Sequence, residues 1–191
     1  MNRTITHLMM NEEAFAYKQK IKNAIAMKLG LSSLHAGGHV IRNEKGWREN
    51  EKTVRYIWIV DVSRSFVGFG GIFAVQFEES QFRGQQNPAE LVQGIFLTDD
   101  TGIATIHIEW PSPIPDKIRA FPSLDVFDSG TWLALDGVNY IIHIIAHSVD
   151  SIICVNNPSS PSWQAWETAV WETGKYLAER SGNEKMIELF T

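Results

Sequence analysis

The chain has 191 residues, 44% of them hydrophobic and 20% charged, and its single cysteine, Cys154, excludes an intramolecular disulfide. Residues 1–64 hold eleven Lys and Arg against six Asp and Glu, whereas residues 65–191 hold six against sixteen, so a net charge of +5 is followed by one of −10. The lysines of the basic third do not share one side of a helix. We therefore do not expect nucleic acid as a partner, and this third can instead face the acidic remainder of its own fold or a second copy.

No apolar run approaches the roughly 20 residues that a membrane helix needs. Near the N-terminus, Asn11, Glu12 and Glu13 interrupt the apolar stretch that a signal peptide requires. We expect a cytoplasmic protein that does not contact a membrane. Residues 1–191 are expected to form a single domain, since the chain is long for one domain and short for two.

The first expected element is a helix over residues 12–29. Asn11 can cap this helix, and Gly30 can end it. Apolar residues at helical spacing, including Tyr17, Ile21 and Ile25, predict one side that packs on the rest of the fold. Residues 31–52 are predicted as a loop, the best candidate for mobile or functional backbone because they combine glycines with mixed charges.

Strands are predicted from Val54 onward. Residues 54–62 are apolar on both faces, which is typical of a central strand. Residues 67–77 alternate between large apolar side chains and smaller residues. Their glycines do not indicate a phosphate-binding loop, because no Gly-Lys-Ser/Thr follows and the run does not open a helix.

Two hairpins are expected next. The first covers residues 91–110 and closes at residues 99–102, which places Gly94 opposite His107. The second turns at Asp136-Gly137 and pairs Leu133 with Tyr140. A further reversal near residues 148–151 leads into the last strand.

The last long element is a helix that begins after Ser160 and ends at Gly182. Ser160 can cap it and Pro161 suits its first turn. Trp163, Trp166, Val170, Gly174 and Leu177 fall on one side, with Trp171 and Ala178 at its edge. The predicted fold is therefore α+β: an antiparallel sheet of about six to eight strands in a meander, with an N-terminal and a C-terminal helix packed against one face.

Histidines offer one metal hypothesis. His143 and His147 are four residues apart, a spacing that suits an ion on a helix, but the flanking isoleucines predict a strand on which they lie about 13 Å apart. His35 and His39 repeat the spacing in a glycine-rich segment, so a zinc site formed by His35, His39 and His143 is an alternative. No metal or other cofactor is favoured. Cys154 is expected to be buried rather than nucleophilic.

The hairpin around residue 137 is apolar on both faces, so the second face of the sheet needs cover. Candidate interaction residues are Trp132, Ile141, His143 and Trp171. Because no complete catalytic set is present, we expect a non-enzymatic binding or protein-interaction domain whose partner is a second copy or another protein. The alternative is a small-molecule-binding protein or metal-dependent enzyme with a histidine-containing pocket between sheet and helices.

Overall fold

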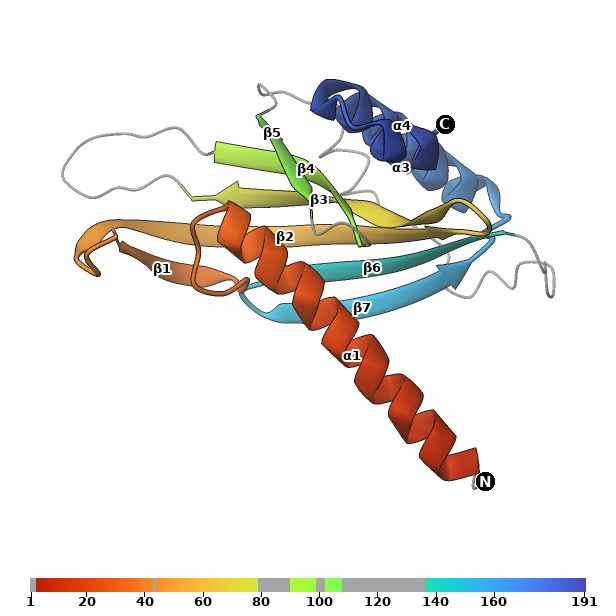
Figure 1. Cartoon of the computed structure of the whole chain (residues 1–191), viewed down its shortest axis with the longest axis horizontal. Coiled ribbons are helices and arrows are strands. Elements are labelled where there is room, and N and C mark those ends of the chain that lie inside the picture. Colours follow the sequence, from red (N-terminus) through yellow and green to blue (C-terminus); the bar gives the residue numbers. More distant parts are fainter. Residues whose placement is uncertain (1–2, 43, 79–89, 99–101, 108–136) are drawn as a thin grey trace.

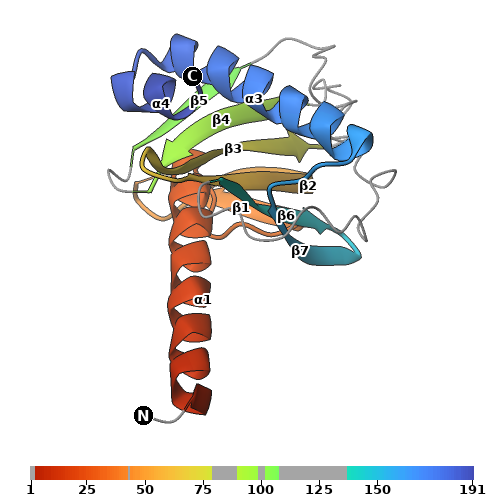
Figure 2. The ribbon, with the colours of Figure 1, turned by 90° about the vertical axis from the view of Figure 1, so that its right-hand side faces the viewer.

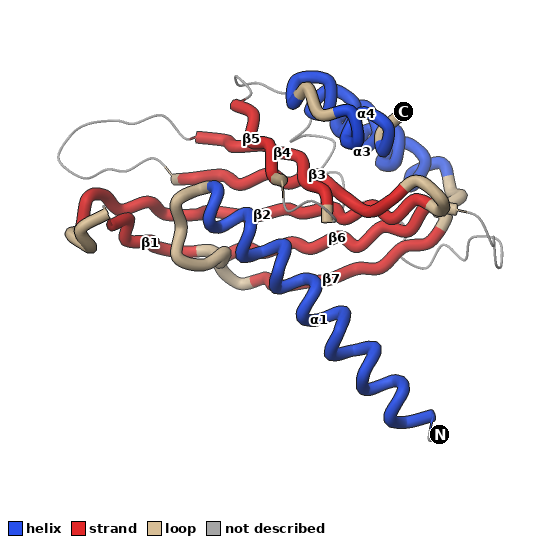
Figure 3. Tube along the Cα trace, viewed as in Figure 1, coloured by secondary structure: helices blue, strands red, loops and turns tan. Residues whose placement is uncertain are grey.

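A computed structural model of the chain describes residues 3–42, 44–78, 90–98, 102–107 and 137–191 (Figures 1 and 3). In these residues a long helix is followed by seven strands and two C-terminal helices. The elements are α1 (Arg3–Lys28), β1 (Gly37–Arg42), β2 (Arg48–Arg64), β3 (Gly68–Phe77), β4 (Glu90–Leu97), β5 (Ile103–His107), β6 (Val138–Ala146), β7 (Val149–Asn156), α3 (Pro161–Ser181) and α4 (Glu184–Leu189). The predicted α+β class with an antiparallel sheet is confirmed.

The sheet has the strand order β5-β4-β3-β2-β6-β7, and every described pairing is antiparallel. β1 to β5 are sequential neighbours, as in the predicted meander. β6 then returns to β2, on the edge that β1 also uses: β1 pairs with residues 48–54 and β6 with residues 56–64. The 17-residue β2 therefore joins both halves of the sheet.

The helices lie on opposite faces of the sheet, as Figure 2 shows. α3 and α4 pack on one face, which we call the α3 face, against side chains that include Trp58 and Ile142. α1 packs on the other, the α1 face, where Ile25 joins a core with Ile59 and Phe73. The expectation that both helices share one face was wrong, because a strand that is apolar at consecutive positions needs cover on both sides.

α1 is longer than predicted, since it begins at Arg3 and contains residue 11 within it rather than as a cap. Its end agrees with the sequence: Gly30 adopts a left-handed φ of 68°, which glycine tolerates without a Cβ penalty. Of the α1 side chains from Phe15 onward, which the structure describes, the buried ones are Ile21, Ile25 and Ala26, near this end. The N-terminal half extends past β7, away from the sheet (Figures 1 and 2).

α3 follows the sequence prediction closely. The Ser160 side chain accepts a hydrogen bond from the backbone N–H of Trp163, Pro161 opens the helix, and Gly182 ends it at φ 66°. Eight residues along its length are buried: Trp163, Trp166, Ala169, Val170, Thr173, Gly174, Leu177 and Ala178. The absence of a side chain at Gly174 lets α4 approach, because a Cβ there would lie 2.1 Å from the Phe190 ring.

Three local predictions differ from the structure. The predicted loop 31–52 contains β1 and the start of β2, which pair with each other as antiparallel strands. In the β4–β5 hairpin, Gly94 pairs with Thr105 rather than His107, a slip of two residues that keeps every side chain on its predicted face. Tyr140 pairs with Val62 and Val155 instead, and its predicted partner Leu133 lies outside the described residues.

Candidate functional site

A row of polar side chains crosses the α1 face. Asp61 on β2, His143 on β6 and Asp150 on β7 share this face, because Ile59 pairs with His143 and Asp61 with Ile141. Polar groups in the middle of a sheet need partners, since burial without a hydrogen bond is costly. These three residues are the natural starting point for a functional site.

His143 and Asp150 form a direct contact. His143 is 5% exposed, and its Nε2 lies 2.6 Å from Asp150 Oδ1, so the imidazole N–H donates to the carboxylate. Burial lowers the pKa of His143, while the bond to Asp150 acts in the opposite direction. The same bond is the main reason why the pKa of Asp150 is lowered. The pair is thus a neutral histidine held by an ionised carboxylate.

Asp61 is the most perturbed carboxyl of the row. It is 7% exposed, and burial raises its pKa from 3.8 to about 6. The Tyr17 hydroxyl of α1 donates to its Oδ1 over 3.4 Å, and the nearby positive charge of Lys18 also favours the ionised form. Lys22, one turn further along α1, lowers the pKa of both Asp150 and His143, which favours the ionised carboxylate and the neutral imidazole. α1 therefore docks over the row with complementary charge.

Beyond this row the α1 face carries exposed apolar side chains on β6 and β7, which we call the β6–β7 strip: Ile141, Ile152 and Cys154. Ile152 is 45% exposed, Cys154 is exposed and Ile141 is half-buried. The prediction that Cys154 is buried was wrong, because it lies on an edge strand that α1 does not cover. Of the predicted interaction residues, Ile141 and His143 lie here.

Trp171, another predicted interaction residue, lies instead on the α3 face. Its indole Nε1–H donates to the Tyr140 hydroxyl over 2.8 Å, and that hydroxyl donates to Glu167. Burial and the neighbouring carboxylate raise the pKa of Tyr140. Trp171 is only partly accessible and is held in this chain of bonds. Trp132 lies outside the described residues.

The histidines of the metal hypothesis do not converge. The His35 and His39 rings lie 4.1 Å apart, and His39 Nε2 is bonded to the His35 carbonyl. His39 pairs with Lys52 and His143 with Ile59, so seven residues of β2, roughly 23 Å, separate them. Within the described part of the chain, no group of three His, Cys, Asp or Glu side chains could hold a metal ion. His107 ends β5 and pairs with Val92 on β4.

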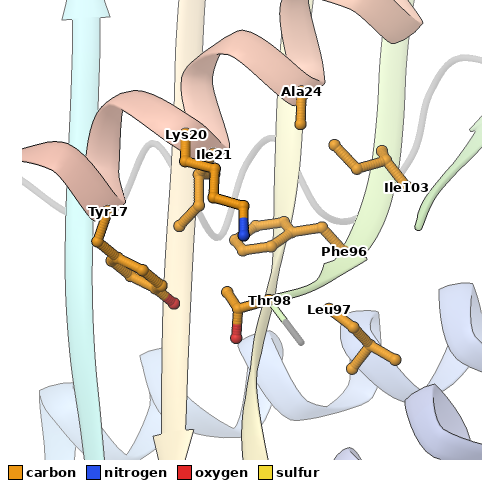
Figure 4. Close-up of a pocket in the computed structure, with 8 residues that line it drawn as sticks. All are labelled: Tyr17, Lys20, Ile21, Ala24, Phe96, Leu97, Thr98 and Ile103. Carbon is orange, nitrogen blue, oxygen red and sulfur yellow. The ribbon is translucent and has the colours of Figure 1, made fainter. Parts of the chain in front are cut away.

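A small pocket lies under α1 beside β4 and β5 (Figure 4). Its volume is about 50 Å³, enough for a few atoms, and its lining is almost entirely apolar. Its lining residues are Tyr17, Lys20, Ile21, Ala24, Phe96, Leu97, Thr98 and Ile103. None of these residues is a histidine, so this is not the histidine-containing pocket considered from the sequence.

Comparisons with protein-family models, with curated proteins and with solved structures give no match for this chain. Among the described helices, none combines the length and hydrophobicity needed to cross a membrane.

Asp61 and Asp150 were not singled out from the sequence. Asp61 could have been found, because it is the acidic residue within the apolar run 54–62, and alternation places it beside Ile59. The partnership between His143 and Asp150 depends on the β6–β7 register, which a two-residue turn at His147 and Ser148 sets.

Proposed function

We propose that the chain is a non-enzymatic protein-interaction domain whose α1 face binds a second copy of the same chain. The observation that carries this proposal is the β6–β7 strip, where Ile152 is 45% exposed on a strand whose described backbone partners all lie on β6. An exposed apolar side chain on an open strand edge invites association, and natural proteins usually protect such edges.

α1 supplies the matching surface. Its 26 residues span about 39 Å. Among its described side chains, from Phe15 onward, the buried ones lie between Ile21 and Ala26, whereas Phe15 is 71% exposed. A helix segment without tertiary packing is marginal in water. In a two-fold dimer the N-terminal half of each α1, which extends away from its own sheet, lies over the β6–β7 strip of the other copy and covers it.

Charge favours a second copy as the occupant. The first third of the chain is basic and the remainder is acidic, so two copies can place opposite charges in contact. Asp150, whose side chain is 65% exposed, borders the strip and already attracts Lys22 of its own α1. A lysine of the second α1 can approach the same carboxylate from the open side.

The proposal is tested by measuring molar mass against protein concentration with light scattering. Ile152→Asp places a charge in the strip, and we expect it to weaken self-association at least tenfold, about 1.4 kcal/mol. Phe66→Asp is the matched control, because Phe66 is 96% exposed at the β2–β3 turn, far from the strip. A monomer at every concentration, or equal effects of both variants, would contradict the proposal.

Cys154 provides a second readout without mutation. It lies in the strip and is exposed in the single chain, so association is expected to cover its Sγ. The rate of its reaction with an aromatic disulfide reagent should fall as protein concentration rises, and Ile152→Asp should abolish that fall. Self-association with unchanged thiol reactivity would place the contact elsewhere on the molecule.

A second candidate function is a small-molecule-binding protein or metal-dependent enzyme that uses His143. The contact between His143 and Asp150 favours it, since a carboxylate that orients an imidazole is common at such sites. The metal content of tag-free protein tests it: about one zinc per chain, lost in His143→Gln, would favour this candidate over the first.

A further inference from the structure

A second, larger cavity lies between α1 and the start of β5. Its volume is about 1100 Å³, comparable with the upper end of the range of roughly 300–1,000 Å³ that is typical of small-molecule sites. Within the described part of the chain, Gly102 and Ile103 line it at the start of β5, and the rest of the lining comes from α1. We call this cavity the α1–β5 cleft.

A row of α1 residues at a spacing of four forms one side of the cleft: Ala16, Lys20, Ala24 and Lys28. Residues four apart on a helix are neighbours, with about 6 Å between them, so the two lysines flank Ala24. Ala24 and Ile103 point toward each other from α1 and β5 (Figure 4). The flexible side chains of both lysines can therefore reach a group that lies between Ala24 and β5.

The two lysines give the cleft a positive charge. Among the described side chains, no Asp or Glu forms an ion pair with Lys20 or Lys28, and no acidic residue belongs to the described lining. Lys18 differs, because it lies on the other side of α1 and acts on the carboxyl of Asp61. An anion in the cleft would thus meet two positive charges from α1.

Apolar side chains border the same cleft. Met27 is 81% exposed and Phe15 is 71% exposed, although both are large and hydrophobic. Between them along α1 lie Gln19 and Asn23, and the Gln19 Nε2 donates to the Asn23 Oδ1 over 2.8 Å. Ile103 lies on the β5 side. Exposed apolar groups beside a charged centre favour a ligand that carries an apolar part next to its anion.

The small pocket of Figure 4 adjoins the cleft, because Lys20, Ala24 and Ile103 line both. Its almost entirely apolar lining and its volume of about 50 Å³ suit the end of an apolar chain. The two cavities together therefore combine a charged opening with an apolar recess.

We propose that the α1–β5 cleft binds an organic carboxylate that carries an apolar chain. The carboxylate lies between Lys20 and Lys28, and each of its two oxygens can accept a hydrogen bond from one lysine. The chain packs against Met27 and Ile103. The cleft is on the side of α1 away from the polar row of Asp61, so binding does not depend on the self-association proposed above.

The test follows the methyl signal of Met27 in ¹H–¹³C spectra of the full chain, assigned with Met27→Leu. Octanoate is the probe, used below the concentration at which it forms micelles. Octanol lacks the charge and acetate lacks the chain. We expect octanoate to shift the Met27 signal saturably and both controls to bind at least tenfold more weakly, while the signal of Met186, which is 2% exposed, stays unchanged.

Lys20→Gln is the decisive variant, because it removes a positive charge from the cleft at an exposed position. It should weaken octanoate binding roughly fivefold, since ion pairs near the surface are individually weak. Lys18→Gln is the matched control, the same change on the other side of α1, and should leave binding unchanged. Ile152→Asp should also leave it unchanged, which separates this result from the test of self-association.

Three outcomes would overturn the proposal. The first is an octanoate titration that does not saturate, and the second is equal binding of octanol or an equal loss in Lys18→Gln and Lys20→Gln. The third is a Met27 signal that moves with protein concentration and not with octanoate, which would assign the cleft to a second copy of the chain.

Discussion

The two long helices of this protein cover the same sheet in different ways. α3 is capped at both ends, buries side chains from Trp163 to Ala178, and continues into α4, which packs beside it. α1 is longer, and among its described side chains, which start at Phe15, the buried ones are Ile21, Ile25 and Ala26. α3 is therefore embedded in the core, whereas α1 is attached by its C-terminal turns.

α3 therefore serves mainly to stabilise the fold, whereas α1 also has surface that a partner can contact. Burial along α3 is matched by the apolar side chains of β2 and β6 beneath it, so little of that helix remains for a partner. α1 meets polar groups, including Asp61 and the pair of His143 and Asp150, and leaves Ile152 exposed beside them. The uneven cover of the α1 face is what we propose a second copy completes.

The largest expected effect tests whether the packed part of α1 contributes as much to the stability of the fold as α3 does. Leu177 and Ile25 are both 0% exposed, one on each helix. Leu177→Ala and Ile25→Ala should each lower the free energy of unfolding by about 3 kcal/mol, because each removes core packing and leaves a cavity. Urea denaturation checks this. A cost below about 1 kcal/mol for Ile25→Ala alone would mean that α1 undocks before the rest unfolds.

A somewhat smaller effect concerns the polar row beneath α1. The pKa of Asp61 is about 6 in the folded chain against 3.8 normally, so between these values the folded state holds a proton that the unfolded state has lost. The contribution of Asp61 to stability is therefore highest below about pH 4 and falls as pH rises to 6, by about 2 to 3 kcal/mol. Asp61→Asn should stabilise the chain by this amount at pH 8.

The measurement is the urea midpoint from pH 4.5 to pH 8 for the natural chain and for Asp61→Asn. The two curves should separate progressively as the pH increases. Asp150→Asn is the comparison, because the pKa of Asp150 is lowered and its loss should have the opposite sign, destabilising the chain at neutral pH. Parallel curves for Asp61→Asn would mean that burial does not perturb this carboxyl.

The smallest expected effect compares the C-terminal ends of the two helices. Gly182 ends α3 at φ 66° and Gly30 follows α1 at φ 68°, and a Cβ at either position would meet open space. Replacement by alanine should therefore cost about 1 kcal/mol at each, from backbone strain alone. Thermal unfolding would detect both. A loss for Gly182→Ala without one for Gly30→Ala would sharpen the contrast between the embedded and the attached helix.

The parts of this fold that short-range chemistry determines could be predicted from the sequence. Ser160, Pro161 and Gly182 bound α3, and period-two alternation assigned Phe73 and Val75 to one face of β3. The register of the β4–β5 hairpin was predicted wrongly by two residues. A shift of two residues leaves each side chain on the same face of the sheet, so the hydrophobic pattern cannot distinguish the two registers.

Long-range pairing could not be predicted in this way. No local sequence pattern indicates that β6 pairs with β2, or that Tyr140 pairs with Val62. Either edge of an apolar strand can accept a neighbouring strand equally well. The candidate site depends on that pairing, because Asp61 meets the row of His143 only when β6 joins β2.

The length of β2 has a consequence for the order in which the sheet assembles. During synthesis, β1 to β5 can form as successive local hairpins, but residues 56–64 of β2 then keep one edge open until β6 emerges more than 70 residues later. Pairings so distant in sequence form slowly, and an apolar edge that waits is prone to join another chain. During this interval the open edge of β2, the central strand of the finished sheet, is the part of the growing polypeptide most exposed to aggregation.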